Sequence, residues 1–234
     1  MTEAVPAVDE LVRVAREMVA RELTWGDAGN VSCRSTDELL VTASGARLGD
    51  LTADDVLRVP LGRPAGDATV GATRTRDAAR ARRPSKELPL HRACYAARPD
   101  MAAVLHGAPF HATLVACCDL AVPDGLFVET MHYLERVARV PYHHPGSEEL
   151  AAAVGAAARS AEVLLLENHG VVVLGENPAE ALQGLQVLEL ACRMVVTARS
   201  AGIALRPLPD RTVAGFRGGA GYKRPRRRPG ESGK

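Results

Sequence analysis

Aromatic residues and a surplus of either charge are what this sequence has least of. Only 3% of its 234 residues are aromatic, so we expect a core of Val, Leu and Ala and no extensive stacking on nucleic-acid bases. Its 29 basic residues balance 28 acidic ones, which gives no reason to expect a nucleic acid or a membrane surface as partner. No apolar run resembles a membrane span or a signal peptide. The composition therefore predicts a cytoplasmic protein.

Paired cysteines are also lacking. The sequence has five cysteines, an odd number, and no two of them have the CxxC spacing. Most lie in apolar surroundings, which favours buried reduced thiols over disulfides or a zinc site. We therefore assign no catalytic role to the cysteines, which are Cys33, Cys94, Cys117, Cys118 and Cys192.

Helical and extended patterns are mixed along the chain. Strands are expected in the segments 25–34, 39–51, 101–106, 137–142 and 162–175, the last holding two strands that meet at an Asn-His-Gly turn. Helices are expected after Asp9, Ser85, Ser147 and Asn177, at 109–118, and as a short helix near Thr52. The connections are too short for every strand pair to form a right-handed βαβ unit. This predicts an α/β fold, a single α/β/α three-layer domain with a central, largely antiparallel sheet.

The domain is expected to span residues 1–205, and two arginine-rich segments lie outside its core. Residues 63–84 contain six Arg and no large apolar cluster, which is typical of a surface loop. A lid that adds positive charge over an anionic substrate is the alternative. Residues 206–234 are predicted to be a basic C-terminal tail rich in Pro, Gly and Arg.

One carboxylate and two imidazoles lie at the ends of predicted elements. Glu87 is in the first turn of a helix, His106 closes a strand, and His169 occupies a turn between two strands. Together they would provide three ligands for a divalent ion with open positions for substrate. Alternatively, Glu87 acts as a general base beside the ion. The competing interpretation is structural, because histidines often end strands and a helix dipole favours an acidic first turn.

A second group of residues suits an anion. Backbone amides, hydroxyls and one ammonium group are available in two turns and at a helix N-terminus, a combination that can bind phosphate. Each piece alone is also typical of an ordinary cap or turn. The candidate phosphate-binding residues are Asn30, Ser44, Gly45, Ser85 and Lys86.

Four segments together resemble the class II aldolase/adducin family. They are, in order, GDAGNVSCR, LLVTASGARLGDL, RPSKELPLHRACYAARPDMAAVLH and LLLENHGVVVLGENPAEAL. The resemblance covers about residues 8–200. Within the family, SKE, LGDL and VPYHHPG look most like the 3-oxo-tetronate 4-phosphate decarboxylase type.

The resemblance implies an enzyme and its parts. It implies a metal-dependent carbon–carbon lyase, an aldolase or decarboxylase, that acts on a small phosphorylated sugar or oxo-acid through an enediolate. It also implies a homotetramer and a divalent ion, zinc above all, with manganese, iron or cobalt as alternatives. The phosphate site maps onto the five residues named above and the acid/base onto Glu87. The metal ligands map onto His106, His169 and position 108, and Tyr133 is a candidate proton donor.

Position 108 departs from the family pattern, because it is Ala. A methyl group cannot replace a metal-bound imidazole without loss of affinity. Three outcomes follow: Glu87 is a permanent ligand with His106 and His169, or His111 takes over, or the ion is lost. The last outcome leaves a non-catalytic or metal-independent homologue as the alternative function.

Overall fold

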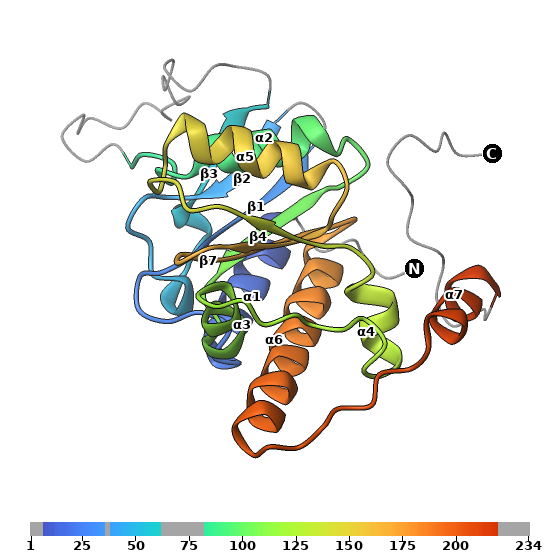
Figure 1. The fold of residues 1–234 in the computed structure, drawn as a ribbon. Helices are drawn as coiled ribbons and strands as arrows, with labels where there is room; N and C mark the ends of the chain where they lie inside the picture. The colour runs from blue at the N-terminus through green and yellow to red at the C-terminus, as the bar shows by residue number, and fades with distance from the viewer. Residues whose placement is uncertain (1–6, 36–37, 62–81, 220–234) are drawn as a thin grey trace, which may run out of the picture.

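A twisted sheet of seven strands forms the centre of the described chain, which in this computed structural model comprises residues 7–35, 38–61 and 82–219. The strand order is β3-β2-β1-β4-β7-β6-β5 (Figure 1). Neighbouring strands are antiparallel except β5 and β6, which are parallel. The sheet is thus largely antiparallel, as predicted from the sequence. The strands are β1 (Asn30–Ser35), β2 (Glu38–Thr42), β3 (Val56–Pro60), β4 (Ala103–Gly107), β5 (Val137–Val140), β6 (Val163–Leu166) and β7 (Gly170–Gly175).

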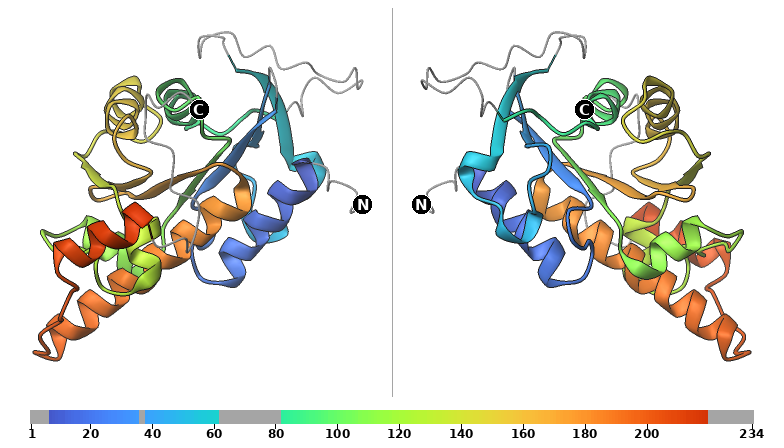
Figure 2. Two further views of the ribbon diagram at one scale, coloured as in Figure 1. Left: turned by 90° about the vertical axis from the view of Figure 1, so that its right-hand side faces the viewer. Right: turned by 90° about the vertical axis from the view of Figure 1, so that its left-hand side faces the viewer.

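Helices cover both faces of the sheet, which confirms the three-layer prediction (Figures 1 and 2). One face carries α1 (Ala7–Ala20), α3 (Phe110–Ala116), α4 (Val128–Tyr133) and α6 (Pro178–Ser200). The other carries α2 (Leu88–Ala97) and α5 (Glu148–Ala158). Alternate residues of one strand enter two separate cores, because successive side chains point to opposite faces: Leu105 of β4 packs toward α6, and Val104 packs toward α2 and α5.

The predicted cap residues have two outcomes. The Ser147 side chain accepts a hydrogen bond from the Leu150 amide, and Asn177 accepts one from Glu180, so both cap their helices as predicted. Asp9 does not cap the first helix, because α1 already begins at Ala7 and Asp9 lies in its first turn. There the negative charge still suits the helix dipole. Two short 3-10 helices, Leu48–Asp50 and Ala53–Asp55, follow β2, and the second, with Thr52 as its N-cap residue, confirms the short helix predicted near Thr52.

Three elements were not predicted from the sequence. These are β3, α4 and α7 (Asp210–Gly219), the last within the expected tail. In α7, Val213 is buried, and Arg217 forms an ion pair with Asp124 at 2.7 Å. Part of the chain after Arg206 therefore packs on the domain, while the boundary at residue 205 stays a prediction. Residues 63–81 of the expected loop and 220–234 of the expected tail lie outside the described residues.

Two further properties concern the whole described chain. All five cysteines are free thiols, and Cys33, Cys94 and Cys192 are buried. Among the described helices, none combines the length and apolar character that a membrane crossing requires.

Candidate active site

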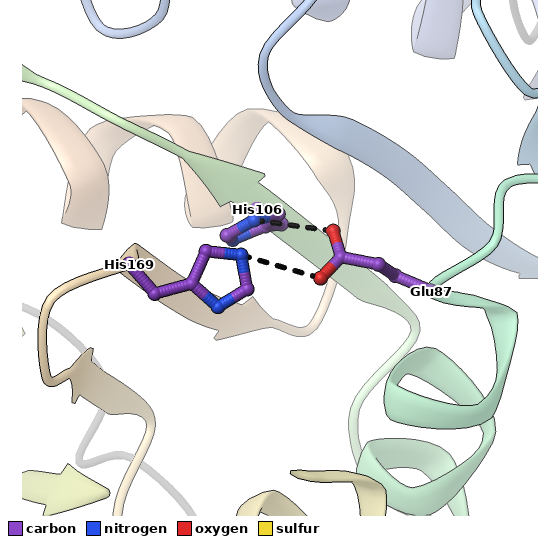
Figure 3. A group of neighbouring side chains, drawn as sticks. All are labelled: Glu87, His106 and His169. Atoms are coloured by element: carbon purple, nitrogen blue, oxygen red, sulfur yellow. Dashed lines mark ion pairs between the residues drawn. The ribbon is translucent and has the colours of Figure 1, made fainter. Parts of the chain in front are cut away.

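Three chain segments that are distant in the sequence bring Glu87, His106 and His169 together (Figure 3). Glu87 is the N-cap residue of α2, His106 lies near the end of β4, and His169 lies in the turn between β6 and β7. Glu87 Oε2 is 3.2 Å from His106 Nε2, and Glu87 Oε1 is 3.4 Å from His169 Nε2. The two imidazole rings meet edge to face, with centroids 4.9 Å apart.

The turn that carries His169 depends on two small or turn-forming residues. Asn168 has a φ of 54°, a left-handed conformation that Asn tolerates better than most residues. Gly170 lies against β4, where a Cβ would be 2.7 Å from the Gly107 carbonyl oxygen. The close approach brings the turn against the end of β4, and so places His169 beside His106.

The donor set fits a divalent ion. One ligand atom from each residue can be chosen so that all three lie within 4.8 Å of one another. The Nδ1–H of His106 donates to the Val171 carbonyl at 2.9 Å, which leaves the Nε2 lone pair facing Glu87. Glu87 Oε1 is buried and accepts no hydrogen bond from any residue in the described ranges. An unsatisfied buried carboxylate oxygen is costly unless it finds a partner, and a cation would provide one.

The protonation states also suit ligands. Burial acts to raise the pKa of Glu87, but His106, a hydrogen bond from Asn30 and His169 outweigh it, so the pKa lies below its usual range. Burial lowers the pKa of His169, with His106 acting in the same direction and Glu87 opposing. A carboxylate and a neutral imidazole are the forms that bind a metal ion.

The predicted phosphate-binding residues line the same pocket as the triad of Glu87, His106 and His169. This pocket has a volume of about 410 Å³. Ser44 and Gly45 follow β2, where Gly45 has a φ of 75°, and Ser85 and Lys86 precede α2. The Ser85 amide donates to the Thr42 carbonyl at 3.0 Å, which holds these two segments together. Lys86 is exposed and is one of the residues that line the pocket.

Asn30 lines the pocket, but its side chain is occupied by other contacts. Its Nδ2 donates to Glu87 Oε2 at 2.8 Å, and its Oδ1 accepts from His91 Nε2. The side chain thus faces Glu87 and the interior of the protein. This differs from the phosphate contact that the resemblance implies for Asn30.

Ala108 lines the pocket beside the triad and offers no ligand atom. His111, the possible replacement, is directed elsewhere, with its Nδ1 2.6 Å from Glu189 Oε1 in a separate pocket along α6. Of the three outcomes considered for position 108, the geometry favours Glu87 as the third ligand.

Tyr133 is not brought to this pocket. It is buried in the apolar core between the sheet and α6, among residues such as Leu134 and Leu188. Conversely, two residues of the site were not predicted from the sequence: Asp27 lines the pocket, and His91 hydrogen-bonds to the Asn30 side chain. The spacing of His91, four residues after Glu87, was an available signal, because residues four apart share one helix face.

Comparison with known proteins gives consistent matches. A 3-oxo-tetronate 4-phosphate decarboxylase of Haemophilus influenzae is 31% identical over 210 residues, which cover 87% of this chain and 92% of the relative. A 5-methylthioribulose-1-phosphate/5-deoxyribulose-1-phosphate aldolase of Escherichia coli is 30% identical over 172 residues, covering 74% and 75%. Among solved structures, YgbL of Klebsiella pneumoniae, titled a putative aldolase/epimerase/decarboxylase, has a TM-score of 0.74 at 29% identity, covering 90% of this chain and 97% of that one.

The family match spans most of the sequence. Residues 9–196 match the family described as Class II Aldolase and Adducin N-terminal domain. The seven-stranded sheet with its two helical layers is the fold of the class II aldolases that it resembles. From the four sequence motifs, the fold and these matches, we conclude that the chain belongs to the class II aldolase and adducin family.

Proposed function

We propose that this protein is a metal-dependent carbon–carbon lyase that acts on a small phosphorylated sugar or oxo-acid through an enediolate. One observation carries the proposal: the triad of Glu87, His106 and His169 shares a single pocket with the candidate phosphate-binding residues. A metal-ligand set and a group of hydroxyl and ammonium donors in one pocket suit a substrate with a carbonyl and a phosphate.

We propose His106, His169 and Glu87 as the metal ligands. Two imidazoles and one carboxylate are a donor set that zinc accepts in catalytic sites, and manganese, iron and cobalt accept it too. A bound divalent ion would polarise the substrate carbonyl and stabilise the negative charge that develops on its oxygen.

Residues of the chain itself would transfer the proton and bind the phosphate. Glu87 Oε2 is held by Asn30, whereas Glu87 Oε1 has no hydrogen bond within the described residues. Oε1 would be a ligand while it is bound to the ion, and once released from the ion it would exchange the proton with the substrate carbon beside the carbonyl. We propose that Lys86 and the hydroxyls of Ser44 and Ser85 bind the phosphate, together with the Gly45 backbone. Asn30 would contribute through its backbone only. Tyr133 receives no role here.

The named relatives support two reactions that share these first steps. One relative is named an aldolase and another a decarboxylase, and both names specify phosphorylated substrates. In aldol cleavage an aldehyde leaves, and in decarboxylation carbon dioxide leaves. Each loss produces an enediolate that must then be protonated. We further propose a cytoplasmic homotetramer, as the resemblance implies.

The test uses both kinds of substrate on the purified protein. We expect turnover of 3-oxo-tetronate 4-phosphate or of 5-deoxyribulose 1-phosphate. Glu87→Gln should lower kcat by roughly 10²–10⁴-fold, because it removes the group that transfers the proton. Glu148→Gln, at the start of α5 and exposed, is the control and should leave kcat unchanged. Equal activity of Glu87→Gln and wild type would exclude the proposed role of Glu87.

A second candidate function is a non-catalytic or metal-independent homologue. One observation favours it: the pocket presents the methyl group of Ala108 where the family resemblance implies a third imidazole. Absence of turnover of both substrates by metal-loaded wild type would favour this candidate.

A further inference from the structure

A chain of buried polar side chains leads from Glu87 into the space between β1 and α2. Asn30 contacts Glu87 Oε2 at 2.8 Å and also contacts His91 Nε2. His91 Nδ1 is 2.6 Å from Ser32 Oγ, which is 2.9 Å from the Tyr95 hydroxyl. The proposed chemistry uses Glu87 and the Asn30 contact that holds it, whereas His91, Ser32 and Tyr95 have no role in it.

This row of polar side chains forms because the helical spacing of α2 and the alternation of β1 each place polar residues on the facing side. Glu87, His91 and Tyr95 are spaced four residues apart and lie on one face of α2. Asn30 and Ser32 are two apart and point to the same face of β1. The helix face therefore packs against the strand face with polar groups in alternation.

Hydrogen-bond chemistry fixes the direction of every contact. The Glu87 carboxylate only accepts, so Asn30 directs its NH₂ group toward Glu87 and its carbonyl toward His91. His91 Nε2 must then carry a hydrogen and donate. A neutral imidazole with Nε2–H accepts at Nδ1, so Ser32 donates to His91 and accepts from Tyr95.

His91 is neutral in this setting. It has no exposed surface. Burial lowers the pKa of His91 to about 3; Glu87 acts in the opposite direction and His106 in the same direction. The imidazole therefore has one donor and one acceptor, and both are used.

We propose that His91 is a positioning residue, whose Nε2–H holds the Asn30 amide so that its NH₂ group fixes Glu87 Oε2 and leaves Oε1 for the ion or the proton. Without this donor, the Asn30 amide is free to rotate and present its carbonyl oxygen to the carboxylate, which repels it. The inference rests on the proposed function for its catalytic consequence. The hydrogen bonds between these polar side chains are observed whether or not the proposed function is correct.

Two amide variants of His91 separate positioning from packing. In Gln the amide reaches the position of Nε2 and can still donate to Asn30, whereas in Asn it reaches only the position of Nδ1, near Ser32. We expect His91→Asn to weaken binding of Zn²⁺ by about 10–100-fold and to lower kcat by a similar factor, with KM little changed. His91→Gln should stay within about threefold of wild type for both quantities. The affinity is measured by competition with a chelator.

A control variant tests general damage to α2. Cys94→Ala removes a buried sulfur from the same helix without touching the polar chain. It should lower the unfolding temperature and leave the Zn²⁺ affinity unchanged. If His91→Gln and His91→Asn weaken Zn²⁺ equally, or if neither weakens it, His91 does not position Glu87.

A readout on the metal-free protein keeps the inference separate from the proposed function. The side-chain amide protons of Asn30, identified in NMR spectra by their loss in Asn30→Ala, should exchange slowly with solvent in wild type and His91→Gln and quickly in His91→Asn. Failure of wild type to bind any metal, with this exchange pattern intact, would contradict the proposed function alone. Equal exchange rates in all three proteins would overturn the positioning role.

Discussion

Glu87 shows how one side chain can have two unlike oxygens. Oε2 accepts from Asn30 and faces His106, while Oε1 accepts no hydrogen bond within the described chain and faces His169. The difference comes from β1, which supplies a donor to one oxygen only. This arrangement suits a general base, since one oxygen holds the carboxylate in position while the other can reach the proton.

Ala108→His tests whether the pocket retains space for a third imidazole. Ala108 lines the pocket next to the triad, so a histidine there would add a ligand to the two imidazoles and the carboxylate. We expect Zn²⁺ affinity to rise about tenfold or more, because ligand number strongly affects binding. Chelator competition measures it, with Ala156→His on the exposed side of α5 as control. Unchanged affinity would show that position 108 does not face the ion.

At the scale of elements, the site lies where three parts of the fold meet. The end of β4, the β6–β7 turn and the start of α2 contribute one residue each to the triad. β4 and β7 are paired neighbours, with His106 opposite Val172. The sheet register therefore determines the distance between the two imidazoles.

Gly170→Ala should displace the β6–β7 turn relative to the end of β4. The added methyl group would lie 2.7 Å from the Gly107 carbonyl oxygen, so either the turn or the end of β4 must shift. We expect a loss of about 1–3 kcal/mol in the free energy of unfolding, together with weaker metal binding as His169 moves. Urea denaturation and chelator competition measure the two effects.

Gly215→Ala is the matched control for this substitution. A Cβ on Gly215 of α7 would meet nothing within 4 Å. Alanine should therefore be tolerated there, with a stability equal to wild type or slightly higher. If Gly170→Ala behaves like this control, the turn does not need glycine.

How far the sequence predicted these elements depended on local signals. Ser147 and Asn177 carry their own cap signal, and both helices begin where expected. β3 is a partly exposed edge strand without a clear alternation, and α4 has only six residues, so neither had a periodic pattern to recognise. The three residues of the triad could be predicted from their motifs in the sequence. The hydrogen bond between His91 and Asn30 could not, because it is a tertiary contact between α2 and β1.

At the scale of the whole molecule, buried charge lies at both ends of the strands. The triad is at one end. At the other end, Glu162, just before β6, forms ion pairs with Arg98 at 2.7 Å and Arg136 at 2.6 Å. Arg98 and Glu162 are almost completely buried, and each has a second partner, because Arg98 also pairs with Asp100 at 2.8 Å. These ion pairs offset the cost of burying the charges. This network joins α2 to β5 and β6, and so supports the layer that carries Glu87.

Stability should depend on pH through His91. The unfolded chain takes up a proton on this imidazole near pH 6.5, whereas the folded protein, in which the pKa of His91 is about 3, does not. The stabilising contribution is complete above pH 6.5 and is lost as the pH falls toward 3, by up to about 1.4 kcal/mol per pH unit. Urea denaturation at pH 7.5 and 5.5 should show a smaller loss for His91→Gln than for wild type. Equal losses would contradict a neutral buried His91.

The central claim is that Glu87, His106 and His169 form a metal site, and metal content tests it most directly. The protein is purified without a histidine tag and analysed by plasma mass spectrometry beside His106→Ala. We predict about one equivalent of zinc, manganese, iron or cobalt per chain in the wild type and its loss in the variant. Wild-type protein that holds no metal after incubation with each of these ions would contradict the account.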